Sequence, residues 1–247
     1  MSTRLVLIAC SLLSALAVTA PLFAQRNRPI YPAYQGFITN ADGSYTLAFG
    51  YFSHNADVVT IPVGPANTWS PTPTDRQAPQ TFLPGHHEFQ CVMVVGADYD
   101  GKLNWTLSYA GATTGTSQHQ LQSSWNLIEN IDALREIDFA HVARGVCLNQ
   151  PPRVRVLGIA RRSTEPLKAS AGRPMSLFGS VSDEGLPRAQ PITVAWKQLS
   201  GPARAVFADE ASARTRVTFS KPGDYELELT ANDSEFSRSA RIRINVR

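Results

Sequence analysis

Short runs of alternating apolar and polar residues, separated by turn-forming residues, fill the second half of the chain. The separators include Ser200-Gly201-Pro202, Pro222-Gly223-Asp224 and Asn232-Asp233. Alternation with a period of two predicts strands that bury one face, and Gly, Pro and Asp between them favour turns. We therefore predict strands at residues 153–159, 175–181, 192–198, 214–219, 225–231 and 240–246.

The first half shows the same alternation less regularly. After the turn signal Asn40-Ala41-Asp42-Gly43, residues 44–52 place Tyr45, Leu47, Phe49 and Tyr51 on one face. Residues 58–63 predict a short strand that Pro62 moves towards a sheet edge.

Two further alternating runs flank Asp98-Tyr99-Asp100-Gly101. Residues 89–95 and 103–109 each alternate, so we predict that they pair as a hairpin around this turn. The Asp-x-Asp-Gly pattern lacks the later glycine and glutamate of an EF-hand, which favours a plain turn over a calcium loop.

Residues 64–88 contain five prolines and show no useful periodicity, which predicts a long irregular loop. Trp69 and Phe82 lie in it. They are candidates for an exposed platform on which a sugar ring or a partner side chain stacks. Alternatively, the two rings fold back and hold the loop against the sandwich.

Near the end of this half, apolar residues recur every three or four positions. This spacing predicts one short helix that packs on the sheet or caps one end of it. Residues 142–148 follow and predict a closing strand. The apolar positions of the predicted helix are Leu127, Ile128, Ile131, Leu134 and Ile137.

Asn149-Gln150-Pro151-Pro152 interrupts the pattern, because a double proline cannot lie inside a paired ladder and favours extended chain. We place a domain boundary here. The prediction is an all-β protein with two β-sandwich domains in tandem: a leader at residues 1–24, an N-terminal β-rich domain at 25–149 and a second sandwich at 150–247.

The C-terminal stretch, with Ser182-Asp183-Glu184-Gly185-Leu186-Pro187, Trp196 and Tyr225, resembles the PKD-like family of immunoglobulin-type sandwiches. The Asn-x-Pro-Pro lead-in also resembles the start of such modules. The resemblance implies a core indole at Trp196 between two sheets. It also implies a tyrosine corner at Tyr225, whose hydroxyl would contact nearby backbone.

The first residues predict export. Arg4 precedes an apolar run at residues 5–18 and then small residues, which is typical of a secretory signal cut after Ala24. Leu7-Ile8-Ala9-Cys10 offers an alternative, a lipoprotein lipobox. We expect a secreted or periplasmic protein with no membrane span after signal removal, since no other segment is long and apolar enough.

Export also bears on the cysteines. Removing the leader leaves Cys91 and Cys147, which we expect to form a disulfide, with two buried thiols as the alternative. A hydrophobic fraction of 43% excludes a wholly disordered chain. A formal charge of +3 is too small to indicate nucleic acid as a partner.

Several carboxylates in the C-terminal stretch raise the question of a metal. The carboxylates are Asp183, Glu184, Asp209 and Asp233. Because relatives of the resembled fold hold calcium near a strand end, the resemblance implies a calcium site at Asp183 and Asp233, whose loops could meet at one end of the sandwich. The alternative is that these aspartates only stabilise turns. His86-His87-Glu88 lacks metal-ligand spacing and favours a surface turn.

The sequence contains no Gly-x-Ser-x-Gly elbow, Walker loop or dinucleotide fingerprint. We expect a non-catalytic exported protein that contacts a protein or glycan through sandwich loops. Two alternatives stay open: a secreted hydrolase with its site in the N-terminal domain, and an assembly subunit that pairs through an edge strand. The N-terminal half, with Asp42-Gly43-Ser44-Tyr45 and Ile61-Pro62-Val63-Gly64-Pro65, also resembles uncharacterised exported bacterial proteins, which implies no known activity.

Overall fold

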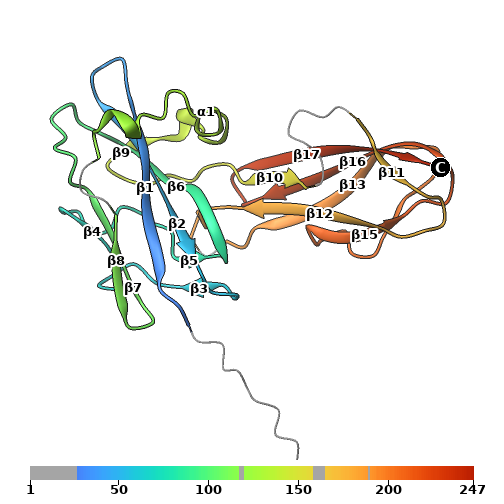
Figure 1. The fold of residues 1–247 in the computed structure, drawn as a ribbon, viewed down its shortest axis with the longest axis horizontal. Coiled ribbons are helices and arrows are strands. Elements are labelled where there is room, and N and C mark those ends of the chain that lie inside the picture. Colours follow the sequence, from blue (N-terminus) through green and yellow to red (C-terminus); the bar gives the residue numbers. More distant parts are fainter. Residues whose placement is uncertain (1–26, 117–119, 158–164, 189) are drawn as a thin grey trace, which may run out of the picture.

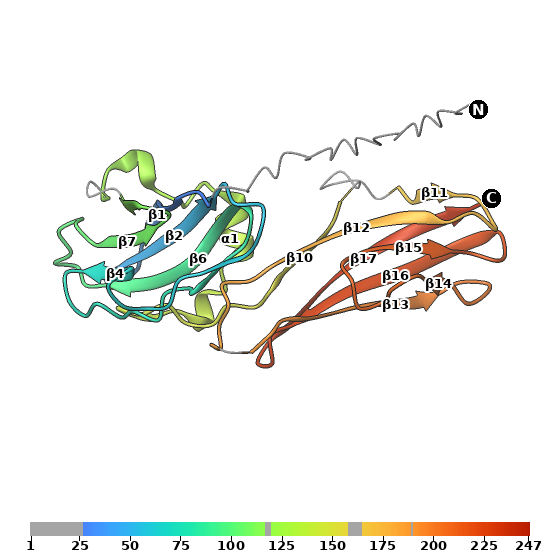
Figure 2. The same ribbon diagram turned by 90° about the horizontal axis from the view of Figure 1, so that it is seen from below.

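The computed structural model describes residues 27–116, 120–157, 165–188 and 190–247. The predicted leader, the lipobox alternative and the cut after Ala24 lie outside the described residues. Within them the chain forms two β-sandwiches that follow one another along the long axis of the molecule (Figures 1 and 2). The predicted boundary falls between the last strand of the first sandwich and the first strand of the second.

The N-terminal sandwich has two main sheets and one small one. In the first sheet neighbouring strands are antiparallel, except for the last, which runs parallel to its neighbour. Its order is β1 (Ile30–Thr39), β2 (Tyr45–Ser53), β6 (Gly85–Val95), β9 (Ala143–Arg144). The second sheet is β4 (Asn67–Ser70), β7 (Asn104–Tyr109), β8 (Ala112–Gly115), and β3 (Val59–Thr60) pairs with β5 (Thr81–Phe82).

Large aromatic rings fill the space between the two main sheets. The indoles of Trp69 and Trp105 stack with centroids 5.4 Å apart and an interplanar angle of 10°. Phe49 meets Trp69 edge-on at 4.9 Å. Such contacts add to the burial of large apolar surfaces, so this core depends on a few bulky rings.

The hairpin predicted around residues 98–101 is wrong. β6 pairs with β2 and β9, whereas β7 pairs with β4 and β8, so the two strands lie in different sheets. Alternation fixes which face of a strand is buried but does not fix its neighbour. The predicted turn is a connection from one sheet to the other.

The first sheet is covered on its second face as well. Leu127, Ala133 and Ile137 pack there against Ala48, Val92 and Phe89. They come from a segment with three short helices: η1 (Ser123–Trp125), α1 (Ile131–Glu136) and η2 (Phe139–His141). Asn130 caps α1, its side chain accepting hydrogen bonds from the backbone N–H groups of Asp132 at 3.0 Å and Ala133 at 3.2 Å.

The close approach of this segment requires Gly36 on β1. A Cβ at this position would lie 2.3 Å from the carbonyl oxygen of Trp125 and 2.7 Å from Leu127, and its φ is +136°. The predicted short helix exists, but its predicted apolar face is only partly buried. Ile128, Ile131 and Leu134 are exposed, because Leu127, Ala133 and Ile137 make the contacts with the sheet.

The predicted disulfide is confirmed. Cys91 on β6 bonds Cys147, which follows β9, and the two Cα atoms lie 4.9 Å apart. The bond closes a sequence separation of 56 residues. It ties the middle of the first sheet to the segment that leads into the second sandwich.

The C-terminal sandwich has two four-stranded sheets. The first orders β10 (Arg153–Val156), β12 (Met175–Ser182), β15 (Arg214–Thr218), β14 (Val206–Phe207), and the second orders β11 (Leu167–Ala169), β17 (Ser237–Val246), β16 (Gly223–Asn232), β13 (Thr193–Ser200). The predicted strands correspond to β10, β12, β13, β15, β16 and β17. Residues 158–159 of the first predicted strand lie outside the described residues.

Trp196 is buried between these sheets, and its Nε1–H donates to the Ala213 carbonyl at 3.2 Å. The hydroxyl of Tyr225 donates to the Lys221 carbonyl at 2.9 Å, a contact four residues back along the chain. On the outer face of the second sheet Arg241 Nε lies 2.8 Å from Glu228 Oε2, across β16 and β17.

Candidate functional site

The clearest concentration of polar groups lies where the two sandwiches meet. We call this region, centred on Gln150 and Arg153, the joint. Gln150 forms hydrogen bonds with both sandwiches. Its backbone N–H donates to Glu184 Oε1 of the C-terminal sandwich at 2.6 Å. Its side-chain oxygen accepts from the Asp138 N–H at 2.7 Å, and its Nε2 donates to the His141 carbonyl at 2.6 Å. One buried residue therefore links the segment around η2 to the loop after β12.

Arg153 makes the second link. Its Nη1 and Nη2 donate to the carbonyls of Glu88 and Phe89, each at 2.6 Å, and its guanidinium lies 5.8 Å from the centre of the Phe89 ring. Nε is 3.5 Å from Glu136 Oε2. A planar guanidinium with several fixed donors suits such a multiple contact.

A bulge in β6 makes those carbonyls accessible. The register between β2 and β6 shifts between Phe49 and Tyr51, and Phe89 adopts a φ of +51°. Bulged residues leave the ladder unpaired, so the Glu88 and Phe89 carbonyls can accept hydrogen bonds from the other sandwich. The same bulge turns Phe89 away from Cys91 and Met93 onto the opposite face, contrary to the simple alternation expected for residues 89–95.

Glu184, Asp183 and Asp233 form the acidic side of the joint. Burial, followed by the nearby Asp183 charge, raises the pKa of Glu184 to about 8. Burial and the charge of Asp233 raise the pKa of Asp183 to about 6. Arg153 opposes both shifts with its charge.

The two aspartates proposed as calcium ligands both stabilise turns with one oxygen. Asp183 Oδ2 accepts from the Gly185 N–H at 2.9 Å, and Asp233 Oδ1 accepts from Phe236 at 2.6 Å. Asp183 Oδ1 and Asp233 Oδ2 are buried and have no hydrogen-bond partner. In the described ranges no three His, Cys, Asp or Glu side chains are grouped so that they could hold a metal.

A small cavity opens beside Arg153, with a volume of about 250 Å³. The His87 ring stacks on Tyr51 at 5.0 Å, its Nε2 lies 3.1 Å from the Pro84 carbonyl, and burial lowers its pKa. Glu136 is in ionic contact with Arg153 and Arg155. The lining combines residues of both sandwiches: His86, His87, Glu88, Glu136, Arg153, Arg155, Ser180 and Ser182.

Three further contacts join the two sandwiches around this centre. Arg188 Nη2 lies 3.0 Å from Asp75 Oδ1, and Asn149 Nδ2 donates to Glu235 Oε2 at 2.9 Å. The His141 ring meets Phe236 edge-on at 4.7 Å. Exposed ion pairs such as Arg188–Asp75 stabilise weakly, whereas Gln150 is buried and makes three hydrogen bonds across the contact.

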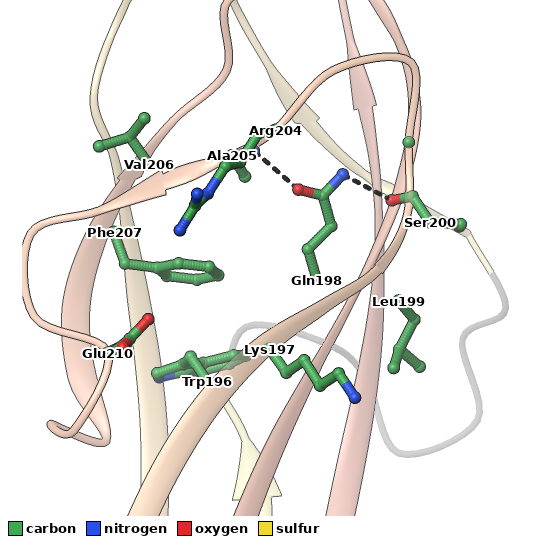
Figure 3. Close-up of a pocket in the computed structure, with 11 residues that line it drawn as sticks. Trp196, Lys197, Gln198, Leu199, Ser200, Arg204, Ala205, Val206, Phe207 and Glu210 are labelled. Carbon is green, nitrogen blue, oxygen red and sulfur yellow. Dashed lines mark hydrogen bonds between the residues drawn. The ribbon is translucent and has the colours of Figure 1, made fainter.

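A larger cavity of about 730 Å³ lies at the open edge of the C-terminal sandwich, between β13 and β14 (Figure 3). Gln198 shapes it: its side-chain oxygen accepts from the Ala205 N–H at 2.7 Å and its Nε2 donates to the Ala203 carbonyl at 2.8 Å. The rings of Trp196 and Phe207 form one wall, with centroids 6.4 Å apart. The polar groups of Gln198 are thus used to hold the chain around the cavity.

Trp69 and Phe82 do not form an exposed platform. Their side chains are 1% and 0% exposed, and both belong to the N-terminal core. The stretch predicted as a loop contains β4 and β5, and Trp69 on β4 is the cross-strand neighbour of Trp105. Burial of the two rings matches the alternative in which they hold this stretch against the sheets.

The chain was compared with known families and solved structures. No family model matches the chain. Similar solved structures include a nucleoside hydrolase-related hypothetical protein from Saccharophagus degradans, described as associated with carbohydrate metabolism (22% identity, 55% of this chain and 35% of that one, TM-score 0.37). The PKD domain of the KIAA 1837 protein is 18% identical (36% and 92%, TM-score 0.26), and titin domains A168–A170 are 10% identical (88% and 66%, TM-score 0.30).

The chain spans about a third of the length of the Saccharophagus protein. The class of protein defined by the fold is an all-β tandem of two sandwiches. No helix in the described part of the chain is long and apolar enough to cross a membrane.

Proposed function

We propose that this chain is an exported, non-catalytic protein of the cell envelope or extracellular space that binds a protein or glycan. Export is supported by the apolar leader and by the Cys91–Cys147 disulfide. In this proposal residues 1–24 are removed, residues 25–149 and 150–247 are separate domains, and the second is a PKD-like module.

The joint is the observation that carries this proposal. Gln150 and Arg153 are buried between the sandwiches and bond both, so the two bodies present their surfaces in one fixed arrangement. A partner that contacts both then loses less entropy on binding, because the arrangement exists beforehand. A fixed arrangement of the two sandwiches is therefore suited to binding a partner that contacts both.

An exposed apolar surface on the N-terminal sandwich supports a protein partner. We call it the helical patch; it consists of Trp125, Ile128, Ile131, Leu134 and Phe139, all exposed. Among the residues that the structure describes, five of the eleven large exposed hydrophobic side chains lie in this short segment. A concentration of exposed large apolar side chains in one segment favours an interaction site over scattered surface hydrophobics.

A capture experiment with the mature protein tests this assignment. Ile131→Asp places a charge in the patch, and Val58→Asp is the matched control, since Ile131 is 52% and Val58 55% exposed on the same sandwich. We expect wild type and Val58→Asp to retain the same envelope protein and Ile131→Asp to lose it. Equal retention by all three, or no enrichment over beads, would contradict the proposal.

The cavity beside Arg153 favours a second candidate, a secreted hydrolase. His86, His87 and Glu88 line it together with two arginines. Hydrolysis of an envelope polymer that disappears in Glu88→Gln and persists in the distant Asp98→Asn would support this function. Unchanged turnover in Glu88→Gln would exclude the cavity as its site.

Calcium binding at Asp183 and Asp233 stays a prediction. It is supported by their two buried oxygens without hydrogen-bond partners and by the affinity of calcium for carboxylate oxygens. A melting temperature that rises with added calcium and falls with chelator is the expected result. Identical melting under both conditions would leave the aspartates as turn residues only.

A further inference from the structure

The outer face of the first C-terminal sheet is basic, and the acid paired with its β10 arginines, Glu136, comes from the N-terminal sandwich. β10, β12, β14 and β15 together contain four arginines and not one Asp or Glu. We call this surface the arginine face. The second sheet differs, because Glu226 and Glu228 on β16 lie opposite Arg243 and Arg241 on β17.

Two of these arginines are free to bind a ligand. Arg214 and Arg216 are exposed on β15, and in the part of the chain that the structure describes neither guanidinium has an acidic partner. Residues two apart on a strand point to the same side and lie about 7 Å apart. They form a fixed pair of forked donors suited to carboxylates or sulfates.

An aromatic ring and hydroxyl groups lie beside the pair. Phe178 on β12 is the cross-strand neighbour of Arg214, and its side chain is 52% exposed. Ser176 is the cross-strand neighbour of Arg216, and Ser180 is that of Arg155 on β10. An exposed phenyl ring on a flat sheet has no packing role towards the core, whereas it can contact the flat face of a sugar ring.

The arginine face continues to the joint. Arg155, Ser180 and Ser182 of its strands line the cavity beside Arg153. The eight residues of β12 span about 26 Å, so the surface is long. The whole segment 150–247 carries 16 Lys and Arg against 10 Asp and Glu, a net charge of +6.

We propose that the arginine face binds a linear acidic polysaccharide, with Arg214 and Arg216 contacting its anionic groups and Phe178 packing on a sugar ring. The length of the face, the exposed phenyl ring, the repeated charge and the hydroxyl side chains favour an extended sugar polymer over a folded acidic protein. This proposal is independent of a protein partner at the helical patch.

Binding of the mature protein to immobilised polygalacturonate tests the proposal, with fully methyl-esterified polygalacturonate as the neutral probe and poly-glutamate as the acidic peptide probe. We expect binding to polygalacturonate alone, weakened by salt. Arg214→Gln with Arg216→Gln should weaken it about tenfold, and Phe178→Ser should weaken it as well.

Arg241→Gln with Arg243→Gln is the matched control, since it removes the same charge from the outer face of the other sheet. It should leave binding within about twofold, because these arginines face Glu228 and Glu226. Equal loss in both double variants would show a nonspecific charge effect. Stronger binding to poly-glutamate would assign the face to an acidic protein, and no binding to any probe would also overturn the proposal.

Discussion

The two sandwiches share an architecture and stabilise it differently. The N-terminal core is built from stacked rings such as Trp69 and Trp105 and is closed by a disulfide. The C-terminal sandwich has no cysteine, and its core is mostly aliphatic around Trp196. The N-terminal sandwich therefore relies on a covalent constraint and bulky rings, and the C-terminal sandwich on regular strand pairing and turns.

The largest expected effect comes from Trp196→Ala. Removing a buried indole and leaving a cavity lowers the free energy of unfolding by about 3–5 kcal/mol. Calorimetry of the mature protein should show the C-terminal transition shifted down and the N-terminal one nearly unchanged. Equal shifts of both transitions would show that the sandwiches unfold together.

Replacing Cys91 and Cys147 with alanine is the complementary change. The bond closes 56 residues, for which loop-closure entropy predicts a loss of about 4 kcal/mol. The free energy of unfolding of the N-terminal sandwich should fall by this amount. Reductant should have no further effect on the double variant. A larger fall in the melting temperature of the C-terminal sandwich than of the N-terminal one would contradict the claim that the disulfide stabilises the N-terminal sandwich.

The pH dependence tests the acidic side of the joint. Glu184 has an ordinary pKa of 4.5 and a folded value of about 8, so the folded protein holds a proton that the unfolded chain has released. Its contribution to stability is complete below pH 4.5 and is lost as pH rises through 8. Asp183 acts in the same direction up to about pH 6.

The expected result is a melting temperature that falls between pH 5 and pH 9. Glu184→Gln needs no proton and can still accept the hydrogen bond from the Gln150 N–H, so this variant should lose much of that dependence and be the more stable at pH 9. Asp209→Asn, an exposed change on the same sandwich, is the control. If the melting temperatures of Glu184→Gln and wild type changed with pH in parallel, the raised pKa of Glu184 would not be the cause of the pH dependence.

The smallest effect is expected for Tyr225→Phe. It removes the hydroxyl that donates to the Lys221 carbonyl and leaves the buried ring in place. We expect a loss of about 0.5–1.5 kcal/mol in urea unfolding, confined to the C-terminal sandwich. A change as large as that for Trp196→Ala would mean that the ring itself had moved.

The two sandwiches also differ in how well their strands can be predicted from the sequence. The long C-terminal strands are bounded by turn residues, and their alternation locates them well. β11 and β14 have only three and two residues, too few for a periodic signal. In the N-terminal half β6 and β7 alternate equally well, but their partners lie in different sheets, which a local pattern cannot specify.

The joint could not be predicted from the sequence. Arg153 belongs to an alternating strand, and its partners, the Glu88 and Phe89 carbonyls, are 65 and 64 residues away and depend on a bulge. Gln150 stands beside a double proline and looks like a linker residue. The charges of Asp183 and Glu184 stand out in the sequence, but only the fold places them near Arg153.

The distribution of distances between one site on each sandwich tests most directly whether the joint holds the two sandwiches in a fixed arrangement. Nitroxide labels at Lys102→Cys and Lys221→Cys, both exposed, report it by pulsed electron spin resonance. We expect one narrow distribution that broadens when Arg153→Gln and Gln150→Ala are added. A broad distribution in the otherwise unchanged protein would contradict the claim that Gln150 and Arg153 hold the two sandwiches as one body.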